Sequence, residues 1–276
     1  MFPPWRNASS YSFVLPRTAF APGCWGWVSQ CYWSGRGDRE RLSAHRRLLG
    51  GKKYVYQPHR ALLGESLWAE LRKLAREQRR PARSVLLRQG DPGTHVMALH
   101  TGSVMITVKS GQGKQTLISV RAAGELLGDL AVLDGQPRTA TVIAAEACRV
   151  HAVPAPEFLQ FVDKHALHGT LLRQSIGRLR AAERINIELA MAPVAIRLAC
   201  TLVRLAAISA IRSCSTPHII LTQEELAQLI GASRNAVGSA LKAWRDRGWV
   251  RTAPGGGLYL ENVEALRAQA HVLSSP

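Results

Sequence analysis

The sequence LTQEELAQLIGASRNAVGSALKAWRDRGWVRTAPGGGLYL, residues 221–260, predicts two short helices joined by a tight turn and followed by a β-hairpin. Thr222 and Glu225 have the spacing of a capping box, in which a hydroxyl and a carboxylate each accept a hydrogen bond from a free backbone N–H at a helix start. Gly231 ends this helix where the backbone must turn left-handed, and Ser233 is the N-cap of a second helix. The order of these signals is typical of a helix-turn-helix.

The second helix is expected to be buried on one face and polar on the other. Val237, Leu241 and Trp244 follow each other at i, i+4 and i+7 and are expected to point inward. A glycine-rich turn then separates residues 249–252 from 258–260, which predicts a two-stranded wing. Because a DNA major groove admits one helix and is lined by phosphates, we expect the polar residues of this region to contact DNA. They are Thr222, Gln223, Ser233, Arg234, Asn235, Ser239 and Lys242, with Arg245, Arg247 and Arg251 at the rim. An amphipathic surface helix is the alternative interpretation.

At 276 residues and 46% hydrophobic content, the chain is long enough for two ordinary domains. The formal net charge of +17 favours a polyanionic partner. Residues 1–66 carry ten Lys and Arg against three Asp and Glu, whereas residues 217–276 carry six against five. The local clustering of basic residues on the second helix, and not the overall charge, therefore supports DNA binding.

Residues 1–64 mix Pro, Gly, Ser, Arg and isolated Trp without a sustained hydrophobic period, which predicts a disordered basic extension. A basic arm that touches DNA and a start codon assigned too far upstream are the alternatives. After this extension, the apolar spacing predicts a helix from Glu65 to Gln78, ending before Pro81.

The five cysteines include no C-x-x-C pair, so the sequence indicates neither a zinc site nor a disulfide framework. No N-terminal apolar run resembles a signal peptide, and Arg197 and Arg204 interrupt the apolar segment 191–211. We therefore expect a soluble cytoplasmic protein without a membrane partner.

Between residues 84 and 153, short β-rich runs alternate with glycine-containing turns. The runs begin at residues 85, 95, 103, 115, 138 and 148, and this spacing predicts an all-β barrel or jelly roll. The segment GELLGDLAVLDGQPRTATV, residues 124–142, breaks the pattern with a short helical turn between two strands.

This segment is a candidate site for phosphate chemistry. Backbone N–H groups at the helix start led by Gly128 favour an anion, and the Arg138 guanidinium can grip it bidentately. The Asp129 carboxylate can accept hydrogen bonds from ribose hydroxyls, and Thr139 is a further candidate. An Arg138–Asp129 salt bridge that closes the loop is the alternative interpretation.

Gly90-Asp91, Gly102, GELLGDLAVLDGQPRTA and SRNAVGSALK together resemble the Crp/Fnr family of bacterial transcription regulators, over roughly residues 65–260. The resemblance implies an α+β fold with three parts. These are a cyclic-nucleotide-binding β-roll or jelly roll at 65–165, a dimerisation helix at 166–192, and a winged helix-turn-helix at 193–276.

The family's cyclic-nucleotide box is Gly-Glu-Leu followed by Arg-Ser/Thr-Ala. The matching residues here are Gly128, Asp129, Leu130, Arg138 and Thr139, with Asp in place of Glu. The resemblance implies that they bind a nucleotide-type effector, a cyclic nucleotide of unknown identity. Ala182-Glu183 stands where the cyclic-AMP receptors carry an adenine-reading Thr-Ser pair, so recognition of adenine is not expected.

No metal or iron–sulfur cofactor is expected. The oxygen-sensing branch of the family uses an N-terminal cysteine cluster, which Cys24 and Cys31 alone do not form. His165 and His168 lie near a helix start, where histidines commonly face solvent.

Residues 167–190 resemble the family's dimer helix, with a roughly heptad-like apolar stripe and arginines outside it. The stripe is Leu171, Leu172, Ile176, Leu179, Ile185, Ile187 and Leu189, and the arginines are Arg173, Arg178, Arg180 and Arg184. Pro193 is expected to break this helix at a hinge before a helix over 194–208. Packing of the stripe against the chain's own β-roll is the alternative.

These expectations describe a homodimeric, sequence-specific DNA-binding regulator of an inverted-repeat operator, with half-site centres roughly 34 Å apart. Arg234 is expected to read guanine and Asn235 adenine. RNA polymerase is a further partner if the protein is an activator. An effector-independent regulator with a vestigial pocket is the main alternative, and a module that regulates a protein partner is another. No nucleophile–base pair, catalytic carboxylate pair or metal triad indicates an enzyme.

Overall fold

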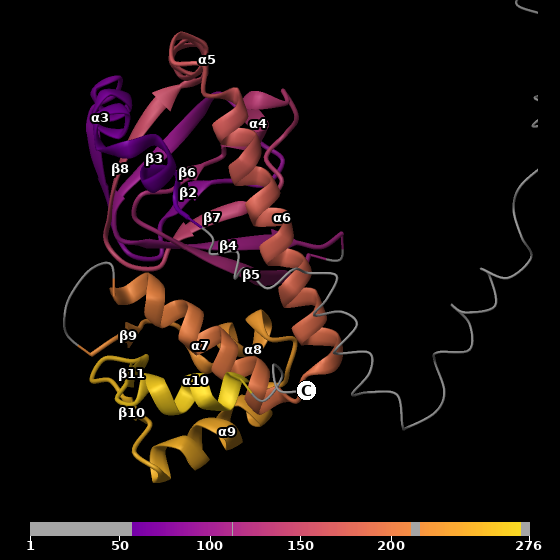
Figure 1. The fold of residues 1–276 in the computed structure, drawn as a ribbon. Helices are drawn as coiled ribbons and strands as arrows, with labels where there is room; N and C mark the ends of the chain where they lie inside the picture. The colour runs from indigo at the N-terminus through magenta and orange to yellow at the C-terminus, as the bar shows by residue number, and fades with distance from the viewer. Residues whose placement is uncertain (1–56, 112, 211–215, 272–276) are drawn as a thin grey trace, which may run out of the picture. The chain divides into compact units, whose positions relative to one another are not determined.

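The computed structural model describes residues 57–111, 113–210 and 216–271 (Figure 1). Its first elements are α3 (His59–Lys73), β1 (Glu77–Arg80), β2 (Val85–Leu87), β3 (His95–Thr101), β4 (Ser103–Lys109), β5 (Gln115–Ala122), β6 (Leu126–Leu127), α4 (Asp129–Leu133), β7 (Thr141–Ala144) and β8 (Cys148–Pro154). They are followed by α5 (Ala155–Lys164), α6 (His168–Met191), α7 (Val194–Ala210), β9 (His218–Ile219), α8 (Gln223–Leu229), α9 (Arg234–Asp246), β10 (Val250–Thr252), β11 (Leu258–Leu260) and α10 (Val263–His271). Most of the predicted extension, residues 1–56, lies outside the described residues.

Strands β1 to β8 form two four-stranded antiparallel sheets, with strand orders β1-β8-β3-β6 and β2-β7-β4-β5. Their alternating apolar residues face each other and fill the space between the sheets, as Leu99, Val104 and Val150 do without any exposure. This arrangement confirms the α+β class with an N-terminal jelly roll. Helix α6 runs along the roll in Figure 1.

The first helix was predicted too late in the chain. It begins at His59, is interrupted at Gly64 with φ +79°, and ends at Lys73. Residues 77–80 form β1 and pair with β8 from Glu77↔His151 to Arg80↔Cys148, although the predicted helix extended through residues 77 and 78. This run has no apolar alternation, so only its pairing with a distant strand makes it a strand.

Helices α6 and α7 lie close to their predicted bounds. Helix α6 ends at Met191, and Ala192 is extended with ψ 142°, the conformation that a following proline favours. Helix α7 then starts at Val194, directly after Pro193.

The C-terminal part contains the predicted helix-turn-helix, but its sheet has three strands, in the order β10-β11-β9. The prediction missed β9 because His218–Ile219 is too short to carry a sequence period. The core of this part contains Leu226, Leu241 and Trp244, and Met105 and Leu117 of the roll contribute to the same cluster. Helix α8 also contacts the roll directly, because the Leu117 N–H donates to Gln228 Oε1 at 2.8 Å.

Candidate functional site

The predicted phosphate loop is built around Gly128, which precedes helix α4 with φ +77°. A Cβ added at this position would lie 2.0 Å from Arg138 Nη1 and 2.9 Å from Leu87 Cδ1. Glycine is therefore required here both for its left-handed backbone and for the close approach of the arginine.

Arg138 is 4% exposed and is held by backbone carbonyls. Its Nη1 donates to Gly128 O at 2.6 Å, and its Nη2 donates to His95 O. Burial lowers the pKa of this guanidinium from its usual value. Within the described residues, no carboxylate lies within 4.0 Å of it. The alternative interpretation, an Arg138–Asp129 salt bridge, is therefore wrong for this structure.

Asp129 instead belongs to a buried group of charges that also contains His59, Glu125 and Arg178, which we call the box cluster. Arg178 Nη1 lies 3.2 Å from Asp129 Oδ1 and 3.1 Å from Oδ2, and its Nη2 lies 3.3 Å from Glu125 Oε2. His59 Nδ1 lies 2.8 Å from Glu125 Oε2, and His59 Nε2 lies 3.3 Å from Asp129 Oδ2. Two cations therefore balance two carboxylates, as buried charges require.

The protonation states of the box cluster follow from these contacts. Burial alone would raise the pKa of Asp129, but Arg178 and His59 hold it well below its usual range. Burial alone would lower the pKa of His59, but Asp129 and Glu125 raise it above its usual value. Both residues are therefore stabilised in their charged forms.

Arg178 was predicted to lie outside the apolar stripe of its helix, but its burial against Glu125 and Asp129 was not predicted. Two buried carboxylates on neighbouring elements draw it inward, and a stripe defined by apolar residues alone cannot reveal that. His59 and Glu125 were both missed: His59 stands in no recognisable motif, and Glu125 lies in Gly124-Glu125-Leu126, whereas the box was assigned to Gly128-Asp129-Leu130.

A cavity of about 500 Å³ opens between the box and helix α6. It is lined by all five predicted ligand residues, namely Gly128, Asp129, Leu130, Arg138 and Thr139, together with Arg121, Ser175, Arg178, Leu179 and Ala182. The cavity thus places the Arg138 guanidinium, polar side chains and apolar walls around one space, the usual composition of a small-molecule site.

The helix-turn-helix has the predicted caps. Thr222 Oγ1 accepts from the Glu225 N–H at 3.1 Å, Glu225 Oε2 accepts from the Thr222 N–H at 2.8 Å, and Ser233 Oγ accepts from the Ala236 N–H at 3.2 Å. Helix α9 buries the three residues predicted to point inward, Val237, Leu241 and Trp244. Of the predicted DNA contacts, only Gln223 is partly buried; Thr222, Ser233, Arg234, Asn235, Ser239 and Lys242 are exposed.

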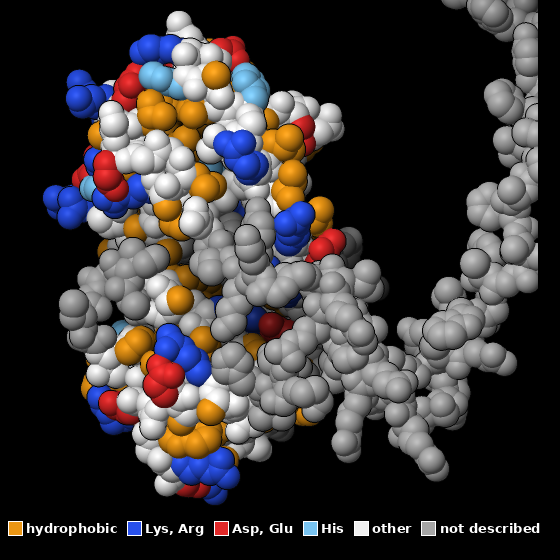
Figure 2. All heavy atoms as spheres, viewed as in Figure 1, with side chains coloured by type: hydrophobic (Ala, Val, Ile, Leu, Met, Phe, Trp, Pro, Cys, Tyr) orange, Lys and Arg blue, Asp and Glu red, His pale blue; other side chains and the backbone are white. Residues whose placement is uncertain are grey.

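The basic residues on and beside helix α9 differ in whether their charges are paired. Arg251 pairs with Glu261 at 2.8 Å and stacks over Tyr259 at 4.5 Å, and Arg247 stacks over Trp249 at 5.2 Å. In the described parts of the chain, Arg234 and Lys242 form no ion pair. Figure 2 shows Lys and Arg side chains gathered at the lower end of this face, over α9. The exposed face of α9 therefore combines free positive charge with hydrogen-bonding side chains.

The residues considered for metal binding have other partners. His165 Nε2 lies 2.9 Å from Glu70 Oε1, and His168 Nε2 lies 3.4 Å from Asp163 Oδ1. Across residues 57–271, apart from the undescribed gaps, no group of three His, Cys, Asp or Glu is arranged to hold a metal ion. Cys24 and Cys31 lie outside the described residues. Among the described helices, none is both long and apolar enough to cross a bilayer.

A jelly roll with a ligand cavity, joined by a long helix to a winged helix-turn-helix, defines a class of DNA-binding transcription regulators. Residues 77–165 match the family model of the cyclic nucleotide-binding domain, and residues 196–269 match that of the Crp-like helix-turn-helix domain. The chain belongs to the Crp/Fnr family.

Relatives and solved structures agree with this assignment. The cAMP-activated global transcriptional regulator CRP of Salmonella typhimurium is 31% identical over 170 residues, which are 60% of this chain and 81% of the relative. The CRP-like cAMP-activated global transcriptional regulator of Mycobacterium tuberculosis is 28% identical over 174 residues, which are 62% and 78% of the two chains. The fold resembles that of FixK2 from Bradyrhizobium japonicum, with a TM-score of 0.61 at 17% identity, covering 71% of this chain and 96% of that one. It also resembles a CRP/FNR family regulator from Thermus thermophilus, with a TM-score of 0.56 at 23% identity and coverages of 71% and 98%.

Proposed function

We propose that this DNA-binding regulator acts as a homodimer on an inverted-repeat operator and that a cyclic nucleotide bound at the box cavity controls it. The observation that carries the effector proposal is Arg138, a buried guanidinium that faces a 500 Å³ cavity and is held only by carbonyl oxygens. Asp129 and Asp91 act on Arg138 only through space, and no described carboxylate lies within 4.0 Å of it, so a phosphate would supply a direct anionic partner. Gly128, Asp129, Leu130 and Thr139 would complete the site.

The dimer proposal is supported by the outer face of helix α6. Leu172, Ile176 and Leu179 follow each other at i, i+4 and i+7 and are 61%, 39% and 61% exposed. An apolar stripe left in water on a long helix favours pairing with a second copy. The alternative, packing on the chain's own roll, holds for Leu171, which is 4% exposed, but not for these three residues.

The DNA proposal assigns the contacts to the exposed polar face of α9 and to the start of α8. Arg234 would read guanine bidentately and Asn235 would read adenine, while Lys242 and the hydroxyls of Thr222, Ser233 and Ser239 would contact phosphates or base edges. Gln223, at the first position of α8, would join them. In this proposal the protein works by binding and not by catalysis. It would act in the cytoplasm, with RNA polymerase as a partner if it activates transcription.

A second candidate is a regulator that binds DNA without an effector. It is favoured by the box cluster, because Arg178 and His59 already engage both oxygens of Asp129, which would otherwise accept from a ribose. The absence of a hydroxyl side chain at Ala182 and Glu183 also argues against an adenine contact.

Selection of DNA sites from a random pool, with and without a panel of cyclic mononucleotides and dinucleotides, tests these proposals. We expect an inverted repeat to be enriched and one nucleotide to change its affinity. Arg138→Ala should abolish that change and retain basal binding, whereas Arg149→Ala, an exposed residue outside the cavity, should behave as wild type. If no nucleotide alters the enrichment, the effector-independent candidate is correct. If Arg138→Ala unfolds the protein, judged by circular dichroism, the arginine has a structural role.

A further inference from the structure

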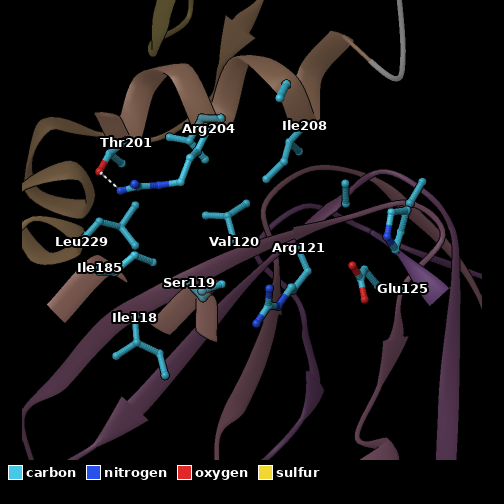
Figure 3. A pocket seen from close by; sticks show the side chains of 16 residues that line it. Ile118, Ser119, Val120, Arg121, Glu125, Ile185, Thr201, Arg204, Ile208 and Leu229 are labelled. Atoms are coloured by element: carbon cyan, nitrogen blue, oxygen red, sulfur yellow. Dashed lines mark hydrogen bonds between the residues drawn. The ribbon is translucent and has the colours of Figure 1, made fainter. Parts of the chain in front are cut away.

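A second cavity, of about 320 Å³, lies between strand β5 and helices α6, α7 and α8 (Figure 3). It is separate from the cavity behind the box, since it shares only Ile118 and Arg121 with that lining. No residue of the cyclic-nucleotide box lines it. The proposed effector function therefore does not account for this space.

The walls of this cavity are predominantly apolar. Strand β5 contributes Val120 and Ala122, helix α6 contributes Ala181 and Ile185, and helix α7 contributes Leu205 and Ile208. Figure 3 shows Val120 pointing from β5 toward α7. Water in such a space finds few hydrogen-bonding partners, so an apolar ligand gains free energy by burying its surface there.

The charged side chains of the lining are two guanidinium groups and one carboxylate, those of Arg121, Arg204 and Glu125. Glu125 is already bound to His59 and Arg178 in the box cluster. Arg204 is fixed in place, because Nη1 donates to both oxygens of Glu188 at 2.8 Å and Nη2 donates to Thr201 Oγ1 at 2.9 Å. Its side chain is still 40% exposed, so it can accept a second anionic partner.

We propose that this cavity is a second ligand site, for a small apolar organic acid. The hydrocarbon or aromatic body would lie against β5 and α7, and the carboxylate would bind the Arg204 guanidinium. A cyclic nucleotide does not suit the site, because Ser119 and Thr201 are the only uncharged polar side chains among the described lining residues and cannot satisfy a ribose and a base.

Occupancy would affect DNA binding through the walls themselves. Strand β5 belongs to the roll, whereas α7 packs on α9 in the core of the helix-turn-helix. A ligand in contact with both walls stabilises the arrangement in which they face each other. The ligand can therefore change operator affinity only to the extent that it binds this arrangement more tightly than other arrangements of the two walls.

The test uses the full chain with decanoate as the ligand and the fluorescence of anilinonaphthalene sulfonate as the displacement readout. Ala181→Leu and Ala207→Leu fill the cavity from two different helices, α6 and α7, and each should weaken decanoate binding by about tenfold or more. Ala182→Leu is the matched control. It adds the same atoms one residue further along α6 but lines the other cavity, so it should leave decanoate affinity unchanged.

A second arm tests the anionic contact. Replacing Arg204 and Glu188 together by glutamine removes the ion pair without leaving an unpaired charge, and should abolish the preference for decanoate over neutral decanol. Circular dichroism establishes folding, and the two filling variants keep the test decisive if one of them does not fold. The proposal is overturned if decanoate does not bind, if both folded filling variants bind like wild type, or if Ala182→Leu weakens binding equally. Arg138→Ala should not alter decanoate binding, which separates this site from the proposed nucleotide site.

Discussion

Replacing Arg178 by methionine removes one of the two cations from the box cluster and leaves its volume largely filled. The side chain is 17% exposed, and its partners Glu125 and Asp129 are 3% and 5% exposed, so solvent screens these contacts only weakly. In the variant, His59 would be the remaining cation of the box cluster, 2.8 Å from the Glu125 carboxylate and 3.3 Å from that of Asp129.

Removing one partner of a buried ion pair typically costs about 3–5 kcal/mol, because the remaining charge is left uncompensated. The lower end applies here, since the Arg178 side chain retains some exposure and His59 still pairs with both carboxylates. We therefore expect a loss of about 3 kcal/mol, which corresponds to a decrease in Tm of about 6–12 °C for a protein of this size.

Thermal unfolding followed by circular dichroism measures this loss, and Arg184→Met is the control because Arg184 is exposed on the same helix. In wild type, the lowered pKa of Asp129 contributes stability above the unfolded pKa of about 4, and this contribution is lost as the pH falls through the folded pKa. The difference between wild type and Arg178→Met should therefore be smaller at about pH 4 than at about pH 7. A loss below about 1 kcal/mol at neutral pH, or an equal loss in the control, would refute the role of the box cluster in stability.

Three further predictions follow from single residues. The pKa of His59 is raised in the folded protein, so its contribution to stability is complete below the unfolded pKa of about 6.5 and is lost as the pH rises through the folded pKa. The Tm difference between wild type and His59→Gln should therefore be larger at about pH 6 than at about pH 9. Equal differences at the two pH values would contradict this. In denaturant unfolding, Gly128→Ala should lower the free energy of unfolding by more than the roughly 1–2 kcal/mol of left-handed backbone strain, because the added Cβ also meets Arg138. Gly135→Ala, with φ +69° and no atom within 4 Å of its Cβ, should lower it by the cost of the strain alone. Arg234→Ala should cost about 1–3 kcal/mol of specific binding to the selected operator in a mobility-shift titration, and unchanged affinity would reject the assignment of this residue.

The helix-turn-helix was predictable because its determinants are local. The determinants are the Thr222–Glu225 capping box, Gly231 and Ser233. Each acts within a few residues of its own backbone partners, so the sequence alone contains the necessary information. Strands β3, β4, β5 and β8 were similarly predictable from apolar runs bounded by turns. In contrast, β1 and β9 exist only through pairing with residues far along the chain.

The box cluster was not predictable for the same reason. His59 meets Glu125 across 66 positions, and Arg178 meets Asp129 across 49, so no local pattern connects them. Arg178 also stands among arginines such as Arg180 and Arg184, which are exposed, and the sequence does not distinguish it from them. The resemblance to the family located Asp129 but not the residues that neutralise it.

The chain carries two similar tripeptides, Gly124-Glu125-Leu126 and Gly128-Asp129-Leu130. Asp129 lines the cavity behind the box, and Glu125 lines the second cavity. Arg178 forms ion pairs with both carboxylates. A ligand in either cavity therefore lies beside a carboxylate of the same cluster.

Helix α6 gives this cluster a direct connection to the proposed dimer contact. Arg178 points into the box cluster, and the next residue, Leu179, is 61% exposed on the apolar stripe. A rotation of helix α6 that moved Arg178 away from Asp129 would also turn Leu179, so a ligand that displaced Arg178 in this way would change the seam of the proposed dimer as well. The size of that change is limited by the ligand's differential affinity for the two arrangements of Arg178. An effector at the box would therefore act on dimerisation and on operator binding through the same helix, with equal and reciprocal coupling between ligand and DNA.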